Sequence, residues 1–288
     1  MDDVDDVDDV DDAPGVWATV NYLAPGSTRN RLYVAPGDHL ATAKYEQHKV
    51  FVRDGRPQRD EFTLDQTGFT FVDHRTAVAA LENPAVLDGG YTGESRALVR
   101  ELTGADHVVS LGWMLRRTTE DRRGALPPAP DVHVDLHTTE IAHRYAKVHA
   151  RSELPKPGTY RRALWTSLWR AFSPPPQDWP LALCDFRSIG DADAAPNLLF
   201  RVPALPQPGE PDAPDEAAES AASLFSYSEE HRWWYFPAMR VEEALLIKLH
   251  DTDHSVAWRA PHTSFHDTEA TSAHPRESVE LRTVAYFR

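Results

Sequence analysis

The chain has 288 residues, 41% of them hydrophobic, which is enough for one large strand-rich domain with a sizeable core. Its formal net charge of −15 argues against a basic surface that binds nucleic acid or an anionic membrane. Cys184 is the single cysteine, so no intramolecular disulfide can form and we expect a reducing, cytoplasmic setting. The sequence contains no run of about 18 apolar residues, the length that a membrane-spanning helix needs.

The N-terminal segment differs from the rest in composition. Residues 2–12 repeat Asp-Asp-Val and carry eight aspartates, about half of the net charge. Such a self-repelling run predicts a disordered acidic leader over 1–14, rather than an ion-binding tail, ahead of a single domain at 15–288. Within that domain, residues 203–222 are rich in Pro, Ala and Glu and predict a surface loop insertion.

Short strands are predicted along most of the domain. An Asp54-Gly55 turn suggests a hairpin between two of them, at 49–53 and 62–64. Helices are expected at 94–102, ending towards Gly104, and at 160–172, stopped by Pro174. This content favours a mainly β fold, a double-stranded β-helix (jelly-roll or cupin-like) core with flanking helices, whose mouth is a natural ligand site. The other expected strands are 17–23, 68–72, 108–115, 132–137, 179–186, 232–236, 244–249, 255–259, a strand beginning at 262, and 278–287.

The stretch Val132-His133-Val134-Asp135 places two metal-binding side chains at alternate positions. Successive side chains of a strand point to opposite faces, so His133 and Asp135 share a face and can hold one ion together. Two histidines and one carboxylate form the facial triad of non-haem Fe(II) oxygenases, which leaves three positions open on the metal. The remaining ligand must come from another part of the chain.

We expect that third ligand to be His262. It follows Pro261 at an expected strand start and precedes Arg276 by 14 residues, about one hairpin. Other histidines in the same third of the chain leave alternatives open: His250, His254, His266 and His274.

Two rival functions follow from the same residues. Strand alternation places His137 on the face of His133 and Asp135, and a zinc ion bound by these three would activate water for hydrolysis. A jelly-roll protein that binds a small molecule without catalysis would tolerate the loss of Asp135. The first rival differs from the iron hypothesis in its metal ligands, because only the zinc site needs His137.

Arg276 and Ser278 lie two residues apart, on one face of the last expected strand. A guanidinium matches a carboxylate with two hydrogen bonds, and the hydroxyl adds a third, so the pair can hold a carboxylate of a co-substrate. Arg282 shares this face and is the alternative anchor. Aromatic and basic residues that would suit a flat or carboxylated substrate, or else belong to the core, are Trp113, Trp169, Arg170, Trp234 and Tyr235.

Read together, these motifs resemble the family of the cephalosporin 7α-methoxylase subunit CmcJ and the fungal hydroxylase/desaturase AsaB, non-haem iron oxygenases of secondary metabolism. The resemblance covers roughly residues 50 to 288. It is carried by the order of Thr103-Gly104-Ala105, Val132-His133-Val134-Asp135, Trp169-Arg170, Pro180-Leu181-Ala182-Leu183-Cys184-Asp185, His231-Arg232-Trp233-Trp234-Tyr235-Phe236 with Met239, Pro261-His262-Thr263-Ser264-Phe265 and Pro275-Arg276-Glu277-Ser278-Val279-Glu280-Leu281-Arg282.

The resemblance implies Fe(2+) bound by His133, Asp135 and His262, with 2-oxoglutarate held by Arg276 and O2 as co-substrate. It implies oxidative tailoring, by hydroxylation, desaturation or cyclisation, of a small-molecule secondary metabolite. The oligomeric state and a partner protein of the same biosynthetic pathway stay open.

Two departures from the family pattern affect these expectations. Leu136-His137 stands where a hydroxyl residue usually follows the aspartate, and Gly112-Trp113-Met114 replaces an expected Asp-His-like pair. The second departure lies where the substrate pocket is expected, so no relative's substrate can be transferred to this chain.

Overall fold

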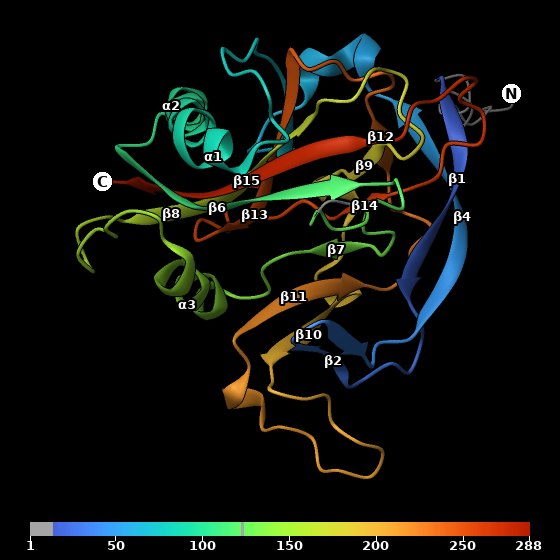
Figure 1. The fold of residues 1–288 in the computed structure, drawn as a ribbon, viewed down its shortest axis with the longest axis vertical. Coiled ribbons are helices and arrows are strands. Elements are labelled where there is room, and N and C mark those ends of the chain that lie inside the picture. The colour runs from blue at the N-terminus through green and yellow to red at the C-terminus, as the bar shows by residue number, and fades with distance from the viewer. Residues whose placement is uncertain (1–13, 122–123) are drawn as a thin grey trace, which may run out of the picture.

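The computed structural model describes residues 14–121 and 124–288 (Figure 1). The expected acidic leader therefore lies outside the described residues except for its last position. No helix in this part of the chain is long and apolar enough to cross a membrane.

Among the described residues, every strand belongs to one of two sheets that face each other (Figure 1). The larger sheet has ten strands, in the order β1 (Gly15–Leu23), β4 (Tyr45–Asp54), β12 (Trp233–Tyr235), β9 (Leu181–Cys184), β14 (His262–Ser264), β7 (His133–Val134), β11 (Ser220–Phe225), β10 (Ala194–Arg201), β2 (Asn30–Ala35) and β3 (Asp38–Ala41). The smaller sheet has five, in the order β5 (Phe69–Asp73), β13 (Glu243–Asp251), β8 (Arg162–Ala171), β15 (Glu277–Phe287) and β6 (His107–Arg117).

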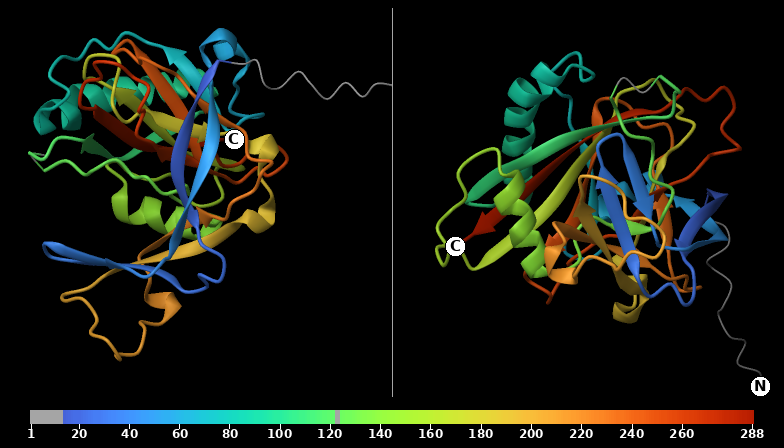
Figure 2. Two further views of the ribbon diagram at one scale, coloured as in Figure 1. Left: turned by 90° about the vertical axis from the view of Figure 1, so that its right-hand side faces the viewer. Right: turned by 60° about the horizontal axis from the view of Figure 1, so that its bottom comes forward.

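Neighbouring strands are antiparallel, apart from the β4–β12 and β2–β10 pairs. The long ribbon of β1 and β4 runs along one side of the molecule (Figure 2). Apolar side chains of the two sheets meet between them; Trp169 and Ile247 of the smaller sheet pack with Leu183 of the larger one. This two-layer arrangement confirms the expected mainly β, jelly-roll core with flanking helices.

Two longer helices close the sandwich. α2 (Thr92–Thr103) follows α1 (Pro84–Val86) and a π-helical turn (Leu87–Tyr91), and it ends as expected before Gly104, whose positive φ of 68° suits glycine. α3 (Thr139–His149) is capped at its N-terminus by Thr138, whose side chain accepts a hydrogen bond from the Ile141 N–H. α2 packs on the outer face of the smaller sheet, whereas α3 covers the end of the inter-sheet space. Single 3₁₀ segments lie at Arg56–Glu61, Phe186–Ser188, Asp191–Asp193 and Asp215–Ala217.

The helix expected at 160–172 is wrong, because these residues form the central strand β8. Trp165 and Trp169 lie four apart, a spacing that fits one face of a helix and one face of a strand equally well. Both faces of β8 are buried: Trp169 packs against the larger sheet and Leu168 packs beneath α2. A strand covered on both faces has no polar side, so its sequence lacks the alternation that identifies strands.

Other expectations also need correction. The hairpin at Asp54-Gly55 does not form, because β4 pairs with β1 and β12 and the chain then enters a 3₁₀ turn. Residues 255–259 are not a strand. The 203–222 segment is irregular except for the 3₁₀ turn at Asp215–Ala217, and its last three residues begin β11. The sequence reading missed β2, β3, β10, β11 and α3.

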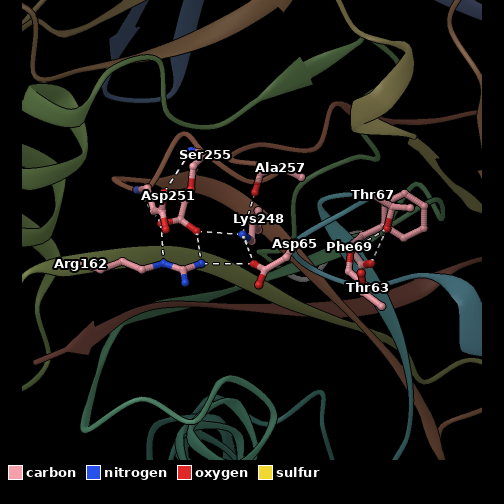
Figure 3. Close-up of polar contacts among 10 residues, drawn as sticks. Thr63, Asp65, Thr67, Phe69, Arg162, Lys248, Asp251, Ser255 and Ala257 are labelled. Carbon is pink, nitrogen blue, oxygen red and sulfur yellow. Dashed lines mark hydrogen bonds and ion pairs between the residues drawn. The ribbon is translucent and has the colours of Figure 1, made fainter.

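A buried ionic network holds the chain that leads into β14 (Figure 3). Lys248 Nζ donates to Asp251 Oδ2 at 2.8 Å, to Asp65 Oδ1 at 3.0 Å and to the Ala257 carbonyl at 2.7 Å. Arg162 joins β8 to the same Asp251 carboxylate at 2.6 Å. Because the side chains of Lys248 and Asp251 are fully buried, this network fixes the position of the segment that precedes β14.

Candidate active site

Two histidines meet at the centre of the larger sheet. His133 of β7 lies directly opposite His262 of β14, with ring centroids 4.6 Å apart. Nδ1 of His133 is 2.8 Å from the Asp131 carbonyl, and Nδ1 of His262 is 3.0 Å from the Ala260 carbonyl. A carbonyl can only accept, so each Nδ1 carries the proton and each Nε2 keeps a lone pair for a metal.

Asp135 follows β7 and forms an ion pair with Arg282, with Oδ1 2.8 Å from Nη2. Burial alone would raise the pKa of this carboxyl, but Arg282, His133 and His262 together lower the pKa to about 2. The group is therefore an anion near neutral pH. As the side chains stand, no three His, Cys, Asp or Glu in the described chain converge tightly enough to hold a metal. The donor set itself, two imidazoles and one carboxylate, fits Fe(II).

The two histidine candidates, His262 and His137, have different surroundings. Burial, followed by the nearby His133, lowers the pKa of His262 to about 4, so its imidazole is neutral and able to bind a metal. His137 instead places Nδ1 2.9 Å from Ser223 Oγ and lines neither of the cavities described below. The structure thus brings His262, and not His137, beside His133.

Arg276 is a buried cation without a carboxylate partner among the described residues. Its Nη1 donates to the Trp179 carbonyl and to Ser264 Oγ, each at 2.8 Å, and its buried Nε has no partner in this part of the chain. Burial, followed by Arg116, lowers the pKa of the guanidinium to about 9. The buried hydroxyl of Ser278, two residues on, is also without a partner there. These unsatisfied donors suit a carboxylate ligand.

Arg282, the alternative anchor, is already engaged. Besides Asp135, it donates from Nη2 to Glu280 Oε1 at 2.9 Å and from Nη1 to the Tyr145 hydroxyl at 3.0 Å. A carboxylate ligand would have to displace two carboxylates from Arg282, whereas Arg276 has no carboxylate partner among the described residues and keeps a buried Nε without any partner there.

Two adjoining cavities surround the histidines. The small cavity, about 20 Å³, is lined by His262, Arg276 and Trp169. The large cavity, about 510 Å³, is lined by Asp135 and Arg282 and extends along β6, β10 and β11. His133 and Arg116 line both cavities.

Of the substrate-binding residues expected from the sequence, some line the two cavities and others do not. Trp113 lines the large cavity and donates to Asp88 at 2.8 Å, and Trp169 lines the small one. Arg170 lies on the opposite face of β8, bonded to the carbonyls of His74 and Val241, and Tyr235 packs in the core against Phe265. Neither lines either of these two cavities. Arg170 points away from them because it follows Trp169 directly in β8, and consecutive residues of a strand point to opposite faces.

Sequence reasoning missed several cavity residues. Tyr145 of α3 and Asn197, Leu199, Ser220 and Leu224 of β10 and β11 line the large cavity. The spacing of Asn197, Leu199 and Arg201 at every second position was an available strand signal.

Known proteins resemble this chain in sequence and in fold. The family described as the oxidoreductase/YMDC permease-like domain matches residues 20–286. The Fe(II)/2-oxoglutarate-dependent dioxygenase nvfI of Aspergillus novofumigatus is 31% identical and covers 90% of this chain and 92% of its own length. The hydroxylase/desaturase CTB9 of Cercospora beticola is also 31% identical, over 86% and 79%. The hydroxylase/desaturase asaB of Aspergillus flavus is 26% identical, over 84% and 82%.

A solved structure, the iron and alpha-ketoglutarate-dependent endoperoxidase NvfI, superposes with a TM-score of 0.78 and 28% identity. The superposition covers 95% of this chain and 98% of that one.

Proposed function

The chain belongs to the oxidoreductase family of Fe(II)- and 2-oxoglutarate-dependent oxygenases that includes nvfI, and we propose that His133, Asp135 and His262 hold its iron. As an enzyme of this family it uses Fe(2+), 2-oxoglutarate and O2 in the tailoring of secondary metabolites. The observation that supports the ligand set is the direct pairing of His133 with His262, each of which uses Nδ1, and not Nε2, for its hydrogen bond to a backbone carbonyl.

Arg276 is the proposed anchor of 2-oxoglutarate, with Ser278 beside it. The small cavity is too small for the whole co-substrate, so only its far carboxylate would enter and meet the guanidinium, which has no carboxylate partner among the described residues. The Trp169 ring lies 5.8 Å from the guanidinium. It would exclude water from the ion pair between Arg276 and the carboxylate, and an ion pair is stronger where water is excluded. The body of 2-oxoglutarate would then lie towards His133, at the junction with the large cavity.

Iron, 2-oxoglutarate and O2 supply the oxidising power when bound, and the protein supplies orientation. The backbone carbonyls of Asp131 and Ala260 fix the two imidazoles in the tautomer that leaves Nε2 available. The large cavity would place the substrate beside Asp135 and away from bulk water. Its volume, about 510 Å³, suits a small-molecule substrate.

The zinc-hydrolase alternative has less support, because His137 is bonded to Ser223 and lies outside both cavities. No observation favours a non-catalytic binding protein. A cytoplasmic setting remains our proposal: Cys184 is buried, and burial raises the pKa of its thiol to about 12, so it is an unreactive core residue.

The test is calorimetric titration of 2-oxoglutarate into the anaerobic protein, with and without Mn(II) as a redox-silent substitute for Fe(II). We expect 2-oxoglutarate to bind only when the metal is present, and metal binding to be lost in His133→Ala. Binding of 2-oxoglutarate that is indifferent to metal and to His133 would refute the proposed site.

A further inference from the structure

One wall of the large cavity is built from alternate residues of neighbouring strands. Asn197 and Leu199 of β10 pair with Ala222 and Ser220 of β11, and all four line the cavity. Leu224 continues this wall along β11. These five positions are apolar apart from the uncharged Asn197 and Ser220, and the charged Arg201 and Glu219 line the cavity next to them, at the loop end of the two strands.

The facing wall comes from the smaller sheet and the loop after it. Leu111, Trp113 and Met114 of β6, together with Leu126, line this side. The space between the walls thus suits a molecule whose body is largely apolar, since burying apolar surface on both sides is favourable.

Each lining arginine has an acidic partner. Arg201 lies 2.8 Å from Glu219, Arg151 lies 3.5 Å from Asp88, and Arg116 lies 3.8 Å from Glu280. Arg282 holds Asp135, and His149, the remaining basic lining residue apart from His133, faces Glu219 at 3.7 Å. An anionic substrate would have to compete with these carboxylates, in contrast to an anion at Arg276. The large cavity therefore offers no ready counter-charge.

Asn197 supplies a specific polar contact on the apolar wall. Its Oδ1 is buried and has no hydrogen-bond partner among the described residues. An unsatisfied buried acceptor is unfavourable until a ligand supplies a donor. The amide can accept from a hydroxyl or, turned over, donate to a carbonyl oxygen.

We infer that the large cavity selects an uncharged, largely apolar molecule carrying a hydroxyl or carbonyl oxygen that bonds to Asn197. This inference rests on the proposed function, because it takes the large cavity as the substrate site. It makes Asn197 a specificity-determining residue.

A matched series of one tricyclic skeleton tests this inference: abietadiene, abietinol and abietate, which differ in a methyl, a hydroxymethyl and a carboxylate group. Affinities are measured by quenching of tryptophan fluorescence in the full chain loaded with Mn(II) and 2-oxoglutarate. We expect abietinol to bind about tenfold more tightly than abietate, and several-fold more tightly than abietadiene.

Two variants separate the contributions. Asn197→Leu should remove the advantage of abietinol over abietadiene while leaving abietadiene binding within about threefold. Glu219→Gln, which frees Arg201 and His149 of their carboxylate, should strengthen abietate binding and leave abietinol unchanged. Binding of 2-oxoglutarate should be the same in both variants as in the wild type, which shows that they are folded.

The inference would be overturned if the wild type bound abietate as tightly as abietinol, or more tightly. An unchanged abietinol preference in Asn197→Leu would also overturn it, as would no binding of any of the three. A wild type that binds neither Mn(II) nor 2-oxoglutarate would instead refute the proposed function, together with the inference that rests on it.

Discussion

Arg282 donates through one nitrogen, Nη2, to both Asp135 and Glu280, at 2.8 and 2.9 Å. Asp135 lines the large cavity and Glu280 lines the small one, so this single cation joins the polar edges of both. The relationship explains why Arg282 is a poor anchor for a co-substrate although it shares a strand face with Arg276. Its charge is already shared between two carboxylates.

Replacing Arg282 with Met should therefore act mainly on stability. The change leaves Asp135 and Glu280 as buried acids without their shared partner, and we expect unfolding to become easier by about 3–5 kcal/mol. Urea unfolding of the two proteins measures the difference. Arg59→Met, which removes a surface pair with Asp73 at 3.0 Å, is the control and should cost less than about 1 kcal/mol. An Arg282→Met protein as stable as this control would contradict the account.

Arg276 should act on the co-substrate. Arg276→Ala removes a charge-assisted contact worth about 2–5 kcal/mol, or roughly 30- to 4,000-fold in affinity for 2-oxoglutarate. Arg276→Lys should recover only part of this, because an ammonium cannot reproduce the planar fork. The measurement is the apparent KM for 2-oxoglutarate at constant iron loading. A KM that rises in Arg282→Met and not in Arg276→Ala would exchange the two roles.

The three histidines should differ in their effect on the metal. His133→Ala and His262→Ala each remove an imidazole from the paired site, so both should abolish Mn(II) binding in calorimetry. His137→Ala should leave that binding within about threefold, because its ring is bonded to Ser223 and lies outside the cavities. Loss of metal in His137→Ala together with retention in His262→Ala would restore the zinc-type ligand set.

The stability of the fold should depend on pH through Glu243. Burial would raise the pKa of this carboxyl, but hydrogen bonds from Arg56 and from the Arg240 backbone lower it to about 2. A lowered folded-state pKa means that Glu243 stabilises the fold fully above its ordinary pKa of 4.5 and progressively less as the pH falls towards 2.

Urea unfolding of wild type and Glu243→Gln from pH 7 to pH 2.5 tests this dependence. We expect the wild type to be more stable at pH 7 and the difference to narrow steadily below about pH 4.5. A difference that is constant across the range would show that the Glu243 charge does not contribute.

Strand alternation in the sequence was sufficient for the mainly β class, whereas the shared metal-binding role of His133 and Asp135 and the anchoring role of Arg276 stay predictions. It failed where the strand was too short. β7 contains only His133 and Val134, so alternation could not be extended to His137, whose backbone is bonded to Ala221 instead. The approach of His262 to His133 depends on β14 lying beside β7, a contact across 129 residues of sequence.

The large cavity was harder to predict because a loop of unusual composition adjoins its wall strands. Its wall strands, β10 and β11, flank a proline-rich loop, and the loop's composition masked the first residues of β11. Arg170, which directly follows Trp169 in the sequence, is one of the expected substrate-binding residues. Its side chain points away from the cavities, because consecutive residues of a strand point to opposite faces. Residue type alone did not distinguish these faces.

The measurement that tests the central claim most directly is metal analysis of anaerobically purified protein, combined with succinate release from 2-oxoglutarate with and without added Fe(II). The account predicts succinate formation that requires Fe(II) and disappears in His133→Ala. It also predicts that the bound metal exchanges for iron. A stoichiometric zinc that resists replacement, with no succinate formed at any iron concentration, would contradict the iron-dependent oxygenase.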